Sequence, residues 1–89
     1  MRKVWKYRLI GQEETCIELP INSKVLSCQV QHGRICLWVE IDEEQIGNPC
    51  KRTFRIFGTD QPIPDGFEYV GTVQEREDYL IWHIYELKS

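Results

Sequence analysis

Two β-rich segments separated by only two residues constrain this chain most. Residues 24–31 and 34–42 flank His32-Gly33. A two-residue connection ending in glycine is typical of a type I′ hairpin, because both central residues need positive φ and histidine tolerates that conformation better than bulkier residues do. Counting outward from the turn gives a register with one uniformly apolar face. The predicted pairs on that face are Val30 with Ile35, Cys28 with Leu37 and Leu26 with Val39, and the other face pairs Gln29 with Cys36 and Ser27 with Trp38.

Period-two alternation between turn residues recurs along the rest of the chain, and no segment of useful length has a helical period. We expect about seven short strands with little or no helix. They would form a small antiparallel β-sandwich or partly closed barrel, and 89 residues suit a single β domain spanning 1–89. The strands outside the central hairpin are expected at residues 2–10, 16–19, 52–57, 67–74 and 79–87, with turns at 11–14, 22–23, 43–51, 58–66 and 75–78.

The last two strands are predicted to form a second hairpin around the turn at 75–78. Counting outward from that turn pairs Val73 with Leu80 and Gly71 with Trp82. A glycine opposite a tryptophan would leave room for the indole ring to lie across the strand.

Charge and cysteine usage limit the partners and the compartment. The net charge of −3 gives no general attraction for a phosphate backbone, so long DNA or RNA is not expected as a partner, although clustered basic residues leave a local anion site open. No targeting segment and no apolar run near the ~20 residues that span a bilayer is visible, so we expect no membrane and a cytoplasmic location. The four cysteines lack Cys-x-x-Cys spacing and are interpreted as reduced thiols.

No catalytic or cofactor motif is present. A phosphate-cradling glycine loop, a Gly-x-Ser-x-Gly elbow and a His-Glu-x-x-His pair are all missing from the sequence. The only histidines are His32 and His83, and the cysteines are better interpreted as small buried hydrophobes than as zinc ligands. We therefore expect no enzyme, no metal and no cofactor.

Residues whose side chains or backbone could bind an anion cluster between positions 52 and 60. Arg52 and Arg55 lead into the irregular segment 58–66, where the backbone of Gly58, Thr59 and Asp60 offers free donors. Such a group can hold a phosphate or carboxylate, although arginines on a strand more often serve solubility. His83 is a further candidate ligand donor, against the alternative of a structural histidine.

Trp38 lies on the wetter face of the central hairpin, beside Ser27. An indole at such a position favours a subunit interface or a second core layer over a ligand platform. A small domain also gains stability from oligomerisation, so we expect a homo-oligomer.

Several sequence blocks resemble a family of small proteins encoded by tailed bacteriophages and prophages. These blocks are Lys3-Val4-Trp5-Lys6-Tyr7, residues 24–31, Cys36-Leu37-Trp38, residues 53–59 with Pro62-Ile63-Pro64, residues 69–74, and residues 82–86. The family is one of unknown function, so the resemblance implies a context, the cytoplasm of an infected bacterium, but assigns no site residue.

That context suggests three functional hypotheses. The first is counter-defence by sequestering a small, nucleotide-like host signal, with Arg52, Arg55 and the 58–60 segment near the ligand. The second is a protein-binding inhibitor of a host factor that uses an exposed aromatic face including Trp38. The third is a minor virion component.

Overall fold

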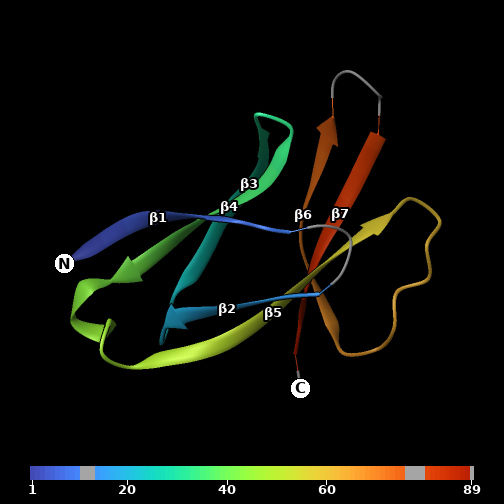
Figure 1. Ribbon diagram of the computed structural model, residues 1–89. Helices are drawn as coiled ribbons and strands as arrows, with labels where there is room; N and C mark the ends of the chain where they lie inside the picture. The colour runs from blue at the N-terminus through green and yellow to red at the C-terminus, as the bar shows by residue number, and fades with distance from the viewer. Residues whose placement is uncertain (11–13, 76–79, 89) are drawn as a thin grey trace.

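A computed structural model describes residues 1–10, 14–75 and 80–88 (Figure 1). Within these residues the chain is all-β, as expected, apart from one short 3-10 turn, η1. The turns expected at 11–14 and 75–78 fall mostly outside the described residues. The elements are β1 (Arg2–Arg8), β2 (Thr15–Pro20), β3 (Lys24–Gln31), β4 (Arg34–Asp42), η1 (Glu43–Gln45), β5 (Pro49–Gly58), β6 (Phe67–Glu75) and β7 (Leu80–Leu87).

The strands form two antiparallel sheets that pack face to face as a sandwich and do not close into a barrel. One sheet has three strands in the order β1-β4-β3, and the other has four in the order β2-β5-β7-β6 (Figure 1). The two sheets approach each other most closely along β3 and β6, which lie side by side. Pro20 ends β2, an edge strand, where its missing amide donor leaves no gap in the ladder.

The core fills the space between the sheets with apolar side chains from alternate positions. On β1, Trp5 and Tyr7 pack against this core. Burial of such side chains contributes roughly 1.5–3 kcal/mol each and is the main force holding the sheets together. The fully buried members of the core cluster include Leu19, Leu37, Val39, Ile41, Phe54 and Ile84.

The central hairpin follows the predicted register near its turn. His32 and Gly33 have φ of 53° and 72°, as a type I′ turn requires. The pairs from Gln31–Arg34 down to Ser27–Trp38 are confirmed. The predicted pair of Leu26 with Val39 is wrong, because a β-bulge between Val25 and Ser27 brings Val25 opposite Val39 instead. The bulge turns Leu26 outward, where 45% of its surface is exposed.

The register predicted for the second hairpin is also wrong. Val73 pairs with Trp82 and Gly71 with Ile84, because the pairing of β6 with β7 continues to Glu75 and Leu80. A second bulge interrupts β6 between Tyr69 and Gly71, beyond both of these pairs. Gly71 does not make room for a tryptophan across the strand. A Cβ atom placed there would collide with Sγ of Cys28, so this glycine permits the close approach of β6 to β3.

Strand β5 begins at Pro49, three residues earlier than expected, because Pro49–Lys51 pair with the end of β2. The segment after β5 is irregular, as its prolines and glycines predict. No helix among the described residues has the length and apolar character needed to cross a bilayer.

Candidate functional site

The two candidate arginines of β5 do not converge. Arg52 and Arg55 are three residues apart on a strand without a bulge, so their side chains leave opposite faces of the sheet. Arg52 lies on the inner face with Phe54, and Arg55 lies on the outer face with Phe57. The two arginines that the sequence suggested as one anion-binding site therefore lie on opposite faces of the sheet.

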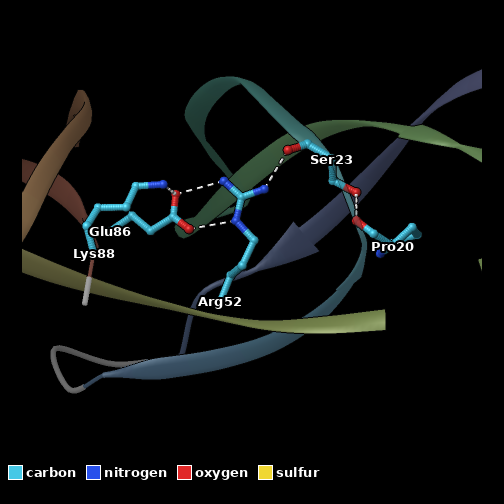
Figure 2. Close-up of polar contacts among 5 residues, drawn as sticks. All are labelled: Pro20, Ser23, Arg52, Glu86 and Lys88. Carbon is cyan, nitrogen blue, oxygen red and sulfur yellow. Dashed lines mark hydrogen bonds and ion pairs between the residues drawn. The ribbon is translucent and has the colours of Figure 1, made fainter. Parts of the chain in front are cut away.

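Arg52 belongs to a buried ion pair at the end of the core (Figure 2). Its Nε and Nη2 donate to the two carboxylate oxygens of Glu86 at 2.6 and 2.8 Å, and its Nη1 donates to the Ser23 carbonyl. Lys88 Nζ lies 3.3 Å from Glu86 Oε1, and the Ser23 hydroxyl donates to the Pro20 carbonyl. This network joins β5, β7 and the turn before β3, so the guanidinium of Arg52 has a structural role.

The electrostatics of this pair favour both charges. Burial raises the pKa of the Glu86 carboxyl, but the hydrogen bonds and charges of Arg52 and Lys88 outweigh it, and the net pKa lies below the ordinary value. The hydrogen bond from the Arg52 guanidinium to Glu86 raises the pKa of Arg52. No local sequence pattern predicts this contact, because the partners are 34 residues apart.

The outer face of the four-stranded sheet carries a second aromatic cluster, separate from the main core. Phe57 is fully buried there, with its ring 5.5 Å from both Phe67 and Tyr85 in edge-to-face geometry. Tyr69 extends the cluster at 5.5 Å from Tyr85, and 56% of its surface is exposed. Arg55 covers the other side of Phe57, with its guanidinium carbon 4.8 Å from the ring centroid.

A chain of side-chain hydrogen bonds crosses the same face. His83 Nε2 lies 3.1 Å from the Thr59 hydroxyl, and His83 Nδ1 lies 3.0 Å from the Thr72 hydroxyl. The Thr72 hydroxyl lies 2.7 Å from the phenol oxygen of Tyr69. Both ring nitrogens of His83 are engaged, so its imidazole is held in one orientation.

The remaining candidates of the 58–60 segment lie at the edge of this face. The backbone N–H of Gly58 donates to the side chain of Gln61 at 3.0 Å, so this donor is occupied. Asp60 is exposed in the turn that follows and has a φ of 70°. The structure therefore brings Arg55, Thr59 and His83 to one face, together with aromatic residues that were not predicted from the sequence as site residues.

We call this outer-face cluster the aromatic face; its residues are Arg55, Phe57, Thr59, Phe67, Tyr69, Thr72, His83 and Tyr85. Period-two positions on β5 and β7 are the signal that would have found its members there, once the register was known. On β6 the bulge between Tyr69 and Gly71 breaks the period, so Tyr69 and Thr72 share the face although they are three residues apart.

Trp38 lies on the opposite side of the molecule. It is half-buried on the outer face of the three-stranded sheet, between Lys6 on β1 and Ser27 on β3. The four cysteines are free thiols, and no cluster of three or more potential metal ligands occurs among the described residues.

These features define a small all-β sandwich with an aromatic outer face and a structural ion pair beneath it. The chain belongs to the family described as a domain of unknown function (DUF7352), whose model matches residues 1–89. Comparison with curated proteins and with solved structures yields no match.

Proposed function

We propose that this protein acts by binding a small, planar anion of nucleotide-like chemistry on the aromatic face. The observation that carries the proposal is the environment of the Arg55 guanidinium. It lies over the Phe57 ring, and within the described residues no hydrogen bond or ion pair engages it. A guanidinium placed over a ring in this way keeps its planar fork of donors for a phosphate or carboxylate.

The exposed aromatic rings supply the second half of the binding chemistry. Tyr69 and Tyr85 form an edge-to-face pair beside Arg55, and Tyr69 is the more exposed of the two. A nucleobase gains about 1–3 kcal/mol by stacking on an aromatic side chain of this kind. A ligand with both a charged group and a flat ring would use Arg55 and Tyr69 together.

The hydrogen-bonded chain favours binding over catalysis. Both ring nitrogens of His83 are engaged by threonine hydroxyls, so neither is free to take a proton from a bound ligand. The hydroxyls of Thr59 and Thr72 are exposed and can bond to polar groups of a ligand. We therefore propose a binding protein and no enzyme.

The resemblance to proteins of tailed bacteriophages suggests a biological role for this binding. A phage protein in the host cytoplasm that holds a nucleotide-like host signal would lower its free concentration and so blunt a defence response. The aromatic face is open to solvent at Tyr69, so a second copy of the chain would be needed to enclose the ligand, which is the basis for proposing a homo-oligomer.

A second candidate function is inhibition of a host protein. Apolar side chains stand exposed on and beside the aromatic face, with Ile81 at 42% and Leu87 at 39% exposure. Such residues are common at protein interfaces, where Tyr69 would act as an anchor. Trp38 would belong to a separate contact on the other sheet.

Two measurements test the proposal. Purified protein is denatured and the released small molecules are identified by mass spectrometry, and cyclic and linear nucleotides are titrated by calorimetry. We expect Arg55→Gln and Tyr69→Ala each to weaken binding about tenfold or more, which corresponds to ~1.4 kcal/mol. Lys51→Gln, an exposed cation on the same strand, is the matched control and should leave the affinity unchanged. The absence of both a released ligand and binding heat would refute the nucleotide proposal. Capture of one host protein that Tyr69→Ala abolishes would favour the alternative.

A further inference from the structure

A cationic depression lies on the outer face of the three-stranded sheet, on the side of the molecule opposite the aromatic face. It measures about 380 Å³ and lies next to the His32-Gly33 turn. Its lining residues are Lys6, Arg8, Gln31, His32, Arg34 and Cys36.

The strand register explains why these cations converge. Arg8 of β1 pairs with Cys36 of β4, and Arg34 occupies the same face of β4 two residues earlier. Lys6 Nζ donates to Gln31 Oε1 at 2.8 Å, and this hydrogen bond spans β4 from β1 to β3. Cys36, only 3% exposed, lies in the floor of the depression.

On this face, acidic side chains lie at one end of the strands and a group of cations lies at the other, beside the hairpin turn. At the far end, Glu40 lies 3.3 Å from Arg2 and Asp42 lies 3.9 Å from the N-terminal ammonium, so the acids there are neutralised. At the near end, three cations line the depression and no acidic side chain does. Among the described residues, no carboxylate forms an ion pair with Arg8 or Arg34. A chain of net charge −3 thus has a local concentration of positive charge.

We propose that this depression binds a compact, multiply charged anion of the oligophosphate class. Two guanidinium forks and an ammonium group supply charge-assisted donors that match phosphate oxygens. The volume lies within the range of small-molecule pockets, and the acidic remainder of the chain opposes a long nucleic acid. This site is independent of the aromatic face, and Trp38 lies directly beside it, since Trp38 pairs with the lining residue Lys6.

The test is calorimetric titration with inorganic tripolyphosphate at low ionic strength. We expect binding by the unmodified chain and a loss of affinity of about tenfold or more in the Arg8→Gln, Arg34→Gln double variant. The control is Lys24→Gln with Lys51→Gln, which removes the same charge from exposed positions outside the depression and should change the affinity less than about twofold. Arg34→Gln alone, on the exposed hairpin, gives a second measurement should the double variant fold poorly.

Two further measurements distinguish a free oligophosphate from a nucleotide as the ligand, and distinguish the depression from the aromatic face as the site. Equal affinity for tripolyphosphate and ATP would mean that the phosphate chain alone is recognised, and weaker binding of ATP would mean that a free oligophosphate fits better; both support the site. Arg55→Gln should leave tripolyphosphate binding unchanged. A failure of the oligophosphate proposal can therefore be distinguished from a failure of the nucleotide proposal, which depends on Arg55. Absence of binding, or equal losses in the double variant and its control, would overturn the inference, as would a loss confined to Arg55→Gln.

Discussion

Breaking the buried ion pair between Arg52 and Glu86 should destabilise the fold strongly. Arg52→Met removes two short hydrogen bonds to a carboxylate whose side chain is only 7% exposed, and also the bond to the Ser23 carbonyl. Stranding one member of a buried pair costs about 3–5 kcal/mol. We expect the low end, about 3 kcal/mol, because Lys88 still lies 3.3 Å from the carboxylate. A domain of this length has a total stability of roughly 4–13 kcal/mol, so this loss is a large fraction of it.

The assay is urea unfolding followed by tryptophan fluorescence in a double-mutant cycle. Arg52→Met and Glu86→Leu are measured singly and together. The double variant should recover most of the stability, since an apolar pair of similar volume often replaces a buried ion pair without loss. Lys51→Met, an exposed change on the same strand, should shift the free energy of unfolding by less than about 0.5 kcal/mol. The reasoning fails if Arg52→Met falls within that range, or if the losses of the single variants simply add in the double variant.

Three further predictions concern the carboxylate of the pair and two glycines. The pKa of the Glu86 carboxyl is lower in the folded protein than its ordinary value of 4.5, so on acidification the unfolded chain takes up this proton first. The stability that the ionised carboxylate contributes is therefore fully present above pH 4.5 and is lost as the pH falls below it. Urea titrations from pH 6 to pH 3 should therefore show a shallower decline for Glu86→Gln, and equal slopes would contradict this. Gly71→Ala should lower the free energy of unfolding by about 1–3 kcal/mol through its clash with Cys28, and adding Cys28→Ala should restore most of it; a loss that persists in the pair would point to the backbone instead. Gly33→Ala meets no neighbouring atom but has a φ of 72°, so thermal unfolding should report a loss of about 1 kcal/mol from backbone strain, and an unchanged melting temperature would refute that origin.

The sequence predicts the fold class and the strands well, because turn chemistry and alternation are local signals. The positive φ of His32 and Gly33 follows from a two-residue hairpin loop, and the register near the turn follows by counting. A bulge breaks this counting at Leu26 in the central hairpin, whereas in the second hairpin the register already differs at the pair of Glu75 with Leu80. The extra residues at Leu26 and near Val70 carry no turn signal, and they arise where β3 and β6 pack together across the sheets.

The candidate site was only partly predictable. The separation of Arg52 from Arg55 follows from strand geometry alone, since residues three apart on a regular strand lie on opposite faces. The burial of Arg52 against Glu86 could not be derived, because it depends on which strand becomes the neighbour of β5 in the sheet. Charge alone does not distinguish an arginine that holds the structure together from one that is available to a ligand.

The clearest pointer to the aromatic face is the composition of β5 itself. Phe54 and Ile56 supply its inner face, yet Phe57 on its outer face is just as fully buried. A strand of a two-sheet sandwich with one solvated face would alternate apolar with polar residues, so an apolar residue on the outer side requires something else to cover it. Here Arg55, Phe67 and Tyr85 provide part of that cover, with the guanidinium of Arg55 over the Phe57 ring and the exposed phenol ring of Tyr69 beside Tyr85. Burial of Phe57 therefore does more than add stability: it fixes the rings and the arginine on which the proposed binding of a planar anion depends.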